Sequence, residues 1–298
     1  MKRFHHKLHS ESRLCQFILA LLILVCFIPL MIVFSASFTS EEYIQEYGYS
    51  ILPHQASFNT YIFLLRNKGM MLLRAYGMTF LVVILGTLYS LTMDTCFAYA
   101  VTQKKSVFRF SRILSFMAWF TTIFGGGVLS WYILCTRYYG LKNNIFALFI
   151  PCGLSVYNMF ILRGNFREIP KEILESARLD GASHAQIFVK IAIPMARGGI
   201  VTVALFRILG FWNDFGTPQY LITDSKLYTM QKILYSMLSN MAELMKNTEM
   251  QSVLEHIVMP TYTAKMAIVV LTILPVILVY PFALKYFVKG INMGGVKG

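Results

Sequence analysis

Charged side chains are scarce in this sequence. Asp, Glu, Lys and Arg make up 14% of the 298 residues, apolar residues make up 56%, and the mean hydropathy is +0.58. A water-soluble domain needs a much more polar surface than this composition supplies. The composition excludes a soluble globular protein and indicates a chain that crosses a membrane several times.

Acidic residues are the scarcer of the two charge signs, because 14 Asp and Glu stand against 27 Lys and Arg, for a net charge of +13. The basic residues lie mainly in short segments beside apolar runs, where membrane anchoring and orientation require them. That distribution argues against nucleic acid as a partner and favours contact with membrane lipid.

Motifs for metal binding and catalysis are also missing. The five cysteines fall in or beside apolar runs without the spacing of paired ligands, so we interpret them as small apolar residues and predict no metal site. The sequence has no G-x-x-x-x-G-K-[ST] phosphate loop and no HExxH motif. We therefore predict no catalytic residue and no cofactor in this chain, and any ATP that drives it must bind another polypeptide.

Long apolar runs are what the sequence has in abundance. A hydrocarbon core of about 30 Å needs roughly 20 apolar residues in a helix. The first run is too long for a cleaved signal peptide, so we predict an uncleaved anchor. The six predicted spans cover residues 14–36, 75–101, 113–135, 145–162, 198–215 and 264–287, each to within a few residues.

The distribution of Lys and Arg favours one orientation of these spans. When both termini are placed in the cytoplasm, most of the 27 basic residues fall on the cytoplasmic side, as the positive-inside rule requires. This predicts a cytoplasmic N-terminal tail over 1–13 and a membrane domain over 14–298. Within that domain, the loop at about 163–197 faces the cytoplasm and the long loop at about 216–263 faces outward.

The cytoplasmic loop at 163–197 contains a charged segment that predicts a helix, a Gly turn at Gly181 and a second helix. Ala177 and Gly181 are four residues apart and leave a smooth strip that another backbone can approach closely, while Glu175 and Asp180 offer charge-assisted contacts. Periodicity alone leaves two interpretations open, a docking element for a soluble partner or a hairpin that fills space between spans.

The spacing in this loop resembles the EAA motif of permease subunits in binding-protein-dependent ATP-binding-cassette (ABC) importers. The matching residues are Glu175-Ser176-Ala177, then Gly181 after three residues, Ile191 after nine more, and Ile193-Pro194. Three further stretches resemble the MalG-like carbohydrate branch of these permeases, namely Phe97-Ala98-Tyr99-Ala100 before Lys104-Lys105, Asp180-Gly181-Ala182, and Phe211-Trp212-Asn213-Asp214. Thr229-Met230-Gln231-Lys232, with the long outer loop, is similar to LplC-like oligosaccharide permeases.

The resemblance implies an all-α membrane protein with the type I ABC importer permease fold, which has six transmembrane helices and a cytoplasmic coupling helix. It also implies a bacterial cell (inner) membrane location and an importer that works by alternating access. The implied partners are a second permease subunit, two cytoplasmic ATPase subunits that carry ATP and Mg, and an extracytoplasmic solute-binding protein. The residues that it assigns to ATPase coupling are Glu175, Ser176, Ala177, Asp180, Gly181, Ala182, Phe188, Ile191 and Pro194.

Asp94 and Arg207 are charged residues that lie deep inside predicted spans, eight to ten residues from the cytoplasmic end. Asp94 and Arg207 fall at matching depths, as judged from the rise per residue of a helix. Because an unpaired charge in a membrane is costly, one interpretation is a structural Asp94–Arg207 pair. The other is that Arg207 lines the transport pathway and attracts an anionic solute such as a uronic-acid oligosaccharide.

The remaining candidates for sugar contact are aromatic and amide residues. Trp212, Asn213 and Asp214 place an aromatic ring beside amide and carboxylate groups, which suits stacking and hydrogen bonding to a sugar, although an interfacial aromatic anchor explains them too. Tyr157 and Asn158 in the fourth predicted span are candidates of the same kind, with hydrogen bonding between helices as the alternative.

The sequence therefore predicts a permease subunit of an ATP-driven importer that moves oligosaccharides, including acidic ones, from a solute-binding protein into the cytoplasm. Two alternatives stay open. One is a permease of the same type for a non-sugar solute, and the other is a membrane enzyme or channel that works without an ATPase.

Overall fold

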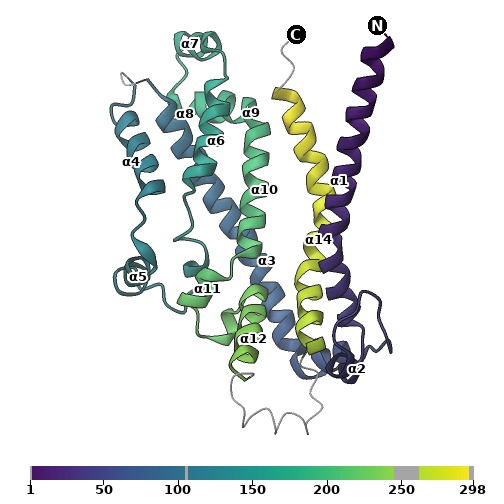
Figure 1. Cartoon of the computed structure of the whole chain (residues 1–298). Coiled ribbons are helices and arrows are strands. Elements are labelled where there is room, and N and C mark those ends of the chain that lie inside the picture. Colours follow the sequence, from purple (N-terminus) through teal and green to yellow (C-terminus); the bar gives the residue numbers. More distant parts are fainter. Residues whose placement is uncertain (1, 105–106, 245–261, 295–298) are drawn as a thin grey trace. The chain divides into compact units, whose positions relative to one another are not determined.

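The regular structure of this chain is helical. The computed structural model describes residues 2–104, 107–244 and 262–294 (Figure 1). Within those ranges the extended pairing is limited to one isolated antiparallel bridge between Thr39 and Ala56. The prediction of an all-α protein is thus confirmed for the part of the chain that the structure describes.

The elements follow one another as α-helices (α) and short π- or 3₁₀-helices (η). They are α1 (Lys2–Ser37), α2 (Glu41–Tyr47), α3 (Asn59–Thr102), α4 (Ser111–Ile123), α5 (Gly127–Ile133), η1 (Leu134–Tyr138), η2 (Ile145–Leu148), α6 (Val156–Arg167), α7 (Lys171–Leu179), α8 (His184–Ile187), η3 (Phe188–Ala192), α9 (Ile193–Met195), α10 (Arg197–Asn213), α11 (Gly216–Leu221), η4 (Ser225–Leu227), α12 (Met230–Leu244) and α14 (Tyr262–Gly294).

The chain divides into two units, of which the first comprises residues 1–70 and 236–275. Within it, the buried carboxylate of Glu41 accepts hydrogen bonds from the backbone N–H groups of Tyr262 and Thr263, at 2.8 and 2.9 Å. The Thr263 hydroxyl donates to the same carboxylate at 2.6 Å. Because a helix N-terminus has unpaired N–H groups and a positive dipole end, Glu41 fixes the start of α14.

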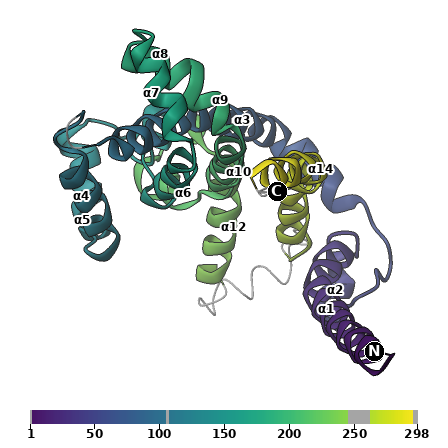
Figure 2. The same ribbon diagram turned by 90° about the horizontal axis from the view of Figure 1, so that it is seen from above.

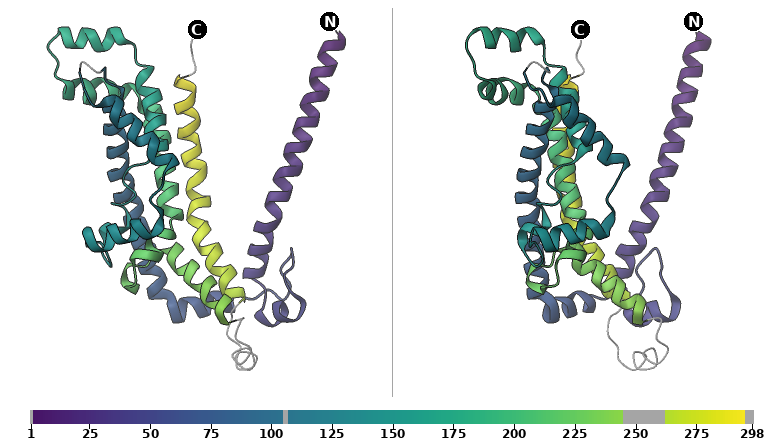
Figure 3. Two further views of the ribbon diagram at one scale, coloured as in Figure 1. Left: turned by 60° about the vertical axis from the view of Figure 1, so that its left-hand side comes forward. Right: turned by 90° about the vertical axis from the view of Figure 1, so that its left-hand side faces the viewer.

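The second unit comprises residues 71–235 and 276–298 and contains two buried apolar clusters. In one, α3, α6 and α10 pack around Ala98, Met159, Leu162 and Val203. Figures 1 and 2 show these three helices side by side. Figure 3 shows α7 lying across one end of α6, so the charged segment predicted from the sequence sits at the end of the helices rather than along them.

Two of the six predicted spans are not continuous helices. The third is broken between α4 and α5, where Gly127 has a φ of +76° that a helix does not permit. The fourth begins with the 3₁₀-helix η2, passes through turns at residues 149–155 and becomes helical only in α6. Glycine and proline in these stretches end the regular hydrogen bonding, so the apolar runs over 113–135 and 145–162 each contain a break in the helix.

By length and apolar composition, two described helices are able to cross a membrane, Cys15–Ser37 within α1 and the whole of α3. The pair His184–Met195 and Arg197–Asn213, bent by 79°, adds a third when it is counted as one crossing. The described part of α14 contributes a shorter apolar helix over Tyr262–Leu278. The described residues thus contain two or three helices long and apolar enough to cross a membrane, which does not confirm the predicted number of six.

Candidate functional site

An ion pair between Asp94 on α3 and Arg207 on α10 is buried in the second unit. Their exposed fractions are 0% and 9%. The guanidinium Nε donates to one carboxylate oxygen and Nη2 to the other, each at 2.8 Å. The pairing is therefore bidentate, the strongest geometry for these two groups. The structure brings together the two charges for which matching depth predicted a pair.

The pair also holds the turn that precedes α6. Arg207 Nη1 donates to the Cys152 carbonyl at 2.9 Å, and Nη2 donates to the Gly153 carbonyl at 3.1 Å. Asp94 accepts from the backbone N–H of Ser155 at 2.9 Å. The backbone groups of this turn have no hydrogen-bond partners within a helix, and buried backbone groups need a partner from elsewhere. The ion pair supplies it and so fixes where α6 begins.

These contacts use most of the hydrogen-bond donors of the Arg207 guanidinium. An arginine has five N–H donors. Four of them are used, two on Asp94 and one each on the carbonyls of Cys152 and Gly153. Little hydrogen-bonding capacity remains for a solute, and the Asp94 carboxylate neutralises the charge. The geometry favours the structural interpretation of Arg207 over that of a receptor for an anion.

A cavity of about 570 Å³ lies beside this ion pair in the second unit. Tyr157, Asn158, Arg207 and Asp214, which are four of the six residues proposed from the sequence for sugar contact, all line it. The other lining residues are Cys152, Ser155, Phe206, Gly210, Phe211 and Thr217. The ring centroids of Tyr157 and Phe206 are 6.4 Å apart.

Sequence reasoning missed Phe206 and Gly210 among the lining residues. Both lie on α10, and they precede Asp214 by eight and four residues. Residues spaced by four share one face of a helix, so a helical projection centred on Asp214 is a signal that finds them.

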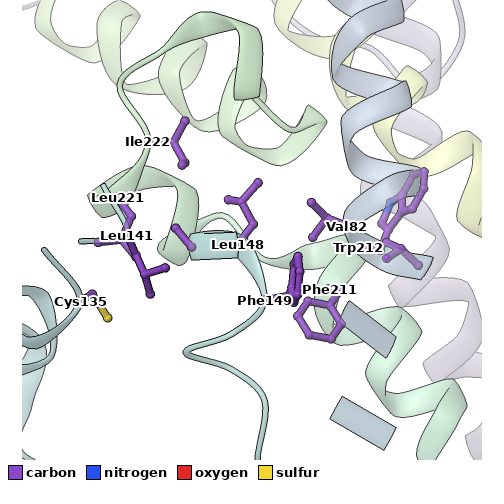
Figure 4. Close-up of a cluster of buried hydrophobic side chains, with 11 residues drawn as sticks. Val82, Cys135, Leu141, Leu148, Phe149, Phe211, Trp212, Leu221 and Ile222 are labelled. Carbon is purple, nitrogen blue, oxygen red and sulfur yellow. The ribbon is translucent and has the colours of Figure 1, made fainter. Parts of the chain in front are cut away.

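Trp212 and Asn213 do not line the cavity. Trp212 is 5% exposed and packs edge-on against Phe80, with ring centroids 5.4 Å apart. Figure 4 shows it within the apolar cluster that also holds Val82 and Phe211. Asn213 donates to the Leu209 carbonyl at 2.9 Å. Trp212 precedes Asp214 by two residues, which on a helix places it on another face, and burial also argues against an interfacial anchor.

The charged loop forms the helix, turn and helix that the sequence predicted. The helix α7 ends at Leu179, and Gly181 follows with a φ of +82°, the left-handed conformation that favours glycine. Ser183 and Gln186 form a capping box that starts α8. The turn is therefore specified by its own residues rather than by neighbouring elements.

The two helices of this loop differ in how they are held. Phe188 in η3 packs against Tyr99 of α3 and Phe166 of α6, with ring centroids 4.7 and 6.5 Å apart. On α7, Leu179 is 89% exposed, and Glu175 makes only a 3.4 Å ion pair with Lys104 in which both side chains are more than half exposed. The second helix is anchored to the helix bundle by aromatic packing, while α7 is held by Leu174 and by a hydrogen bond from Arg178 to Gln103 and leaves Leu179 exposed.

The stretch Thr229–Lys232 lies where α12 begins. The Thr79 hydroxyl on α3 accepts a hydrogen bond from the Met230 N–H at 3.0 Å. The Lys232 side chain donates to Gln219 on α11 and lies over the Tyr228 ring, with its nitrogen 5.6 Å from the centroid. Burial lowers the pKa of Lys232 from its usual value, because the charged form is poorly solvated there. This stretch thus fixes α12 to α3 and α11.

Comparison with known proteins identifies what this arrangement resembles. Residues 8–293 match the family model described as "Binding-protein-dependent transport system inner membrane component". Protein LplC of Bacillus subtilis (strain 168) is 29% identical over 276 residues, covering 92% of this chain and 90% of that protein. The polygalacturonan/rhamnogalacturonan transport system permease protein YtcP of the same organism is 29% identical over 275 residues, covering 92% and 94%.

A solved structure is similar over almost the whole length. It belongs to a bacterial ABC transporter involved in the import of the acidic polysaccharide alginate. The TM-score is 0.79 at 28% identity, and the match covers 94% of this chain and 97% of that one. The similarity to permeases of the LplC type, inferred from the EAA spacing and the Thr229–Lys232 stretch, is confirmed by these relatives.

Proposed function

The chain belongs to the family of binding-protein-dependent transport system inner membrane components, and from this membership we propose that it is a permease subunit of an ATP-driven importer of acidic oligosaccharides. The named relatives support the substrate class, because one is named for polygalacturonan and rhamnogalacturonan transport and another takes part in alginate import. Family membership also makes it a transport subunit rather than an enzyme, as the sequence predicted.

The observation that carries the proposal is the cavity beside the Asp94–Arg207 pair. Tyr157 and Phe206 provide aromatic surface for the apolar faces of a sugar ring, and Asn158, Asp214 and Thr217 provide polar groups for its hydroxyls. Apolar walls with a few polar groups are typical of sites for small molecules.

The charges in the cavity indicate how an acidic sugar is handled. Arg207 is neutralised by Asp94, and Asp214 adds a carboxylate. The cavity is therefore suited to hydroxyls and ring faces, and its described lining has no cationic group free to hold a uronate tightly. We assign selection of the acidic sugar to the solute-binding protein, while this subunit provides a passage that releases its cargo.

The arrangement in the membrane follows from the same proposal. We propose six crossings, with the third and fourth broken at residues 124–126 and 149–155, and both termini in the cytoplasm. Broken segments at membrane depth are tolerated where they are buried in protein or line a cavity, and the turn at 152–155 does both. The tail at 1–13 then precedes a membrane domain over 14–298 in the inner membrane of a bacterial cell.

The proposed function also implies partner proteins and the surfaces on which they bind. We place two ATPase subunits in the cytoplasm with α7 of this chain against one of them, a second permease beside this one, and the binding protein on the outer face. A rigid helix that sits tightly against a closing ATPase passes on its rigid-body motion, which alternating access requires. Glu175, Ala177 and the exposed Leu179 give α7 the polar, small and apolar contacts for this seat.

Uptake into proteoliposomes that contain the whole complex tests the proposal. We expect Tyr157→Ala to lower the uptake rate of a uronic-acid oligosaccharide by at least fivefold, because truncating a well-packed aromatic contact costs more than about 1 kcal/mol. Tyr139→Ala is the matched control, because Tyr139 is an exposed tyrosine outside the cavity. Equal uptake by both variants would refute the assignment of the cavity to the sugar pathway.

A further inference from the structure

A second cavity, of about 140 Å³, lies in the second unit where the last turn of α3 meets α6 and α7. Four cationic side chains line it, Lys104 two residues after the end of α3, Arg167 from α6, and Lys171 and Arg178 from α7. Its volume is several times what one water molecule needs, which is room for a small polar group. The cavity is separate from the one beside the Asp94–Arg207 pair and shares no lining residue with it.

The positive charges in this cavity are not balanced within the described part of the chain. Its one carboxylate, Glu175, lies 3.4 Å from Lys104, and both side chains are more than half exposed, so the pair is weak. Arg167, Lys171 and Arg178 make no ion pair with any described residue. Three cations within one small cavity repel one another unless an anion lies between them.

Arg178 supplies a more specific indication. Its Nη2 donates to Gln103 at 3.4 Å, but its Nε is buried and has no hydrogen-bond acceptor among the described residues. A buried donor without an acceptor is costly and rare in folded proteins. An anion placed between Arg178 and Lys171 would provide that acceptor, because both side chains line the same cavity from one face of α7.

The rest of the lining is mixed in polarity. Thr102 and Gln103 are polar, while Phe166, Ile169 and Leu174 provide apolar surface, which we call the apolar wall. Under the orientation proposed above, the cavity lies at the cytoplasmic ends of membrane helices, which is the depth of lipid headgroups. Basic pockets between helices on that side are suited to anionic lipid headgroups.

We propose that this cavity binds a phosphate group, and the apolar wall favours the headgroup of an anionic phospholipid of the cytoplasmic leaflet as its source. A phosphate held by Lys171 and Arg178 on α7 and by Lys104 just after the end of α3 ties the coupling helix to the helix bundle. The membrane side of the assignment rests on the proposed orientation, whereas phosphate binding itself does not depend on which solute is transported.

The test is thermal unfolding of the purified complex in detergent, with phosphatidylglycerol, phosphatidylcholine or inorganic phosphate added separately. We expect phosphatidylglycerol to raise the unfolding temperature of the wild type and of Arg109→Gln/Lys190→Gln, a control that removes two exposed cations outside the cavity. In Lys171→Gln/Arg178→Gln we expect at least half of that shift to be lost. High salt should reduce the shift, since it screens exposed cations.

Each outcome decides the proposal. A shift with phosphatidylglycerol alone assigns the site to a lipid headgroup, and an equal shift with inorganic phosphate assigns it to free phosphate. Equal shifts for the two double variants, or no shift in the wild type with either anion, would overturn it. Lys171→Gln alone, at an exposed position, serves if the double variant fails to fold. Transport is measured separately, so loss of uptake with the lipid shift intact would count against the proposed function only.

Discussion

Arg207 illustrates how much a single residue's hydrogen bonds reveal about its role. Its charge inside a predicted span suggested either a structural pair or an attractor of anionic sugars. The structure commits four of its five donors to Asp94 and to the carbonyls of Cys152 and Gly153. The residue therefore positions the turn that borders the cavity, and under the proposed function we expect it to affect the sugar only through that turn.

A substitution at Arg207 separates these two roles. We expect Arg207→Gln to reduce uptake of acidic and neutral oligosaccharides by the same factor and to destabilise the protein by about 3–5 kcal/mol, because it leaves Asp94 charged, buried and unpaired. Uptake of the two substrates by one reconstituted complex, together with its unfolding temperature, provides the measurement. Loss confined to acidic sugars would restore the attractor interpretation.

Asp94 provides the complementary experiment. Asp94→Asn keeps the side-chain shape but removes the charge that neutralises Arg207, and we expect a comparable loss of stability. We expect no rescue in the charge-swapped variant Asp94→Arg/Arg207→Asp. In that variant the Ser155 N–H would face another donor, and the carbonyls of Cys152 and Gly153 would face a carboxylate, which is another acceptor. Full stability of the swapped variant would mean that these backbone contacts matter little.

Particular residues show how far the sequence predicts the site. The depth of Asp94 and Arg207 along their helices was enough to pair them, since the rise per residue is constant. Trp212 was misplaced because its chemistry suits a sugar while its direction depends on the rotation of α10 against α3. The spacing of two residues puts Trp212 and Asp214 on different faces of a helix, but the packing of α10 decides which of these faces meets the cavity.

Among the elements, α6 and α10 are packed unusually closely. A Cβ added at Gly199 on α10 would overlap the side-chain amide of Asn165 on α6. We expect Gly199→Ala to destabilise the protein by about 1–3 kcal/mol, as overpacking does. Gly164→Ala on α6 is the matched control, because open space surrounds that position and alanine is the better helix former. The unfolding temperatures of the two purified variants should therefore move in opposite directions.

The turn after α7 allows coupling to be tested apart from folding. Gly181 has a φ of +82° with open space around it, so Gly181→Val strains the backbone by roughly 1–2 kcal/mol and shifts α7 without any collision. We expect fewer sugars imported per ATP hydrolysed by the reconstituted complex. Gly140→Val carries similar strain at a φ of +61°, likewise in open space and outside the loop, and should leave that ratio unchanged. An unchanged ratio in Gly181→Val would argue against α7 as the coupling helix.

The helices and turns differ in how well the sequence predicts them. Gly181 and the Ser183–Gln186 capping box act locally, so their pattern predicted the turn and the second helix. The break before α6 depends on contacts from Asp94 and Arg207, which are more than 50 residues away from it in sequence. Pro151 and Gly153 permit a break at this place, but an apolar run cannot report the tertiary contacts that hold the broken segment.

For the whole molecule, orientation is the property on which the proposals about ATPase seating and lipid contact both depend. The positive-inside rule places the α7 loop in the cytoplasm, and the segment at 222–229 then lies outside. Both segments lie in the second unit, and Asp180 and Ser225 are exposed positions on them. Single cysteines at these two positions therefore report opposite sides of the membrane.

Labelling with a membrane-impermeant maleimide tests that orientation in a background from which the five native cysteines have been removed. We expect Ser225→Cys to react in intact cells stripped of any outer barrier, and Asp180→Cys to react only in inverted vesicles. Each variant is the other's control, because both positions are exposed and differ only in the predicted side. Reversed labelling would move α7 away from the ATPases and the basic cavity away from the cytoplasmic leaflet. Labelling of both positions from the same side would mean that the chain between them crosses the membrane an even number of times. That result would contradict the single crossing that we propose for α10.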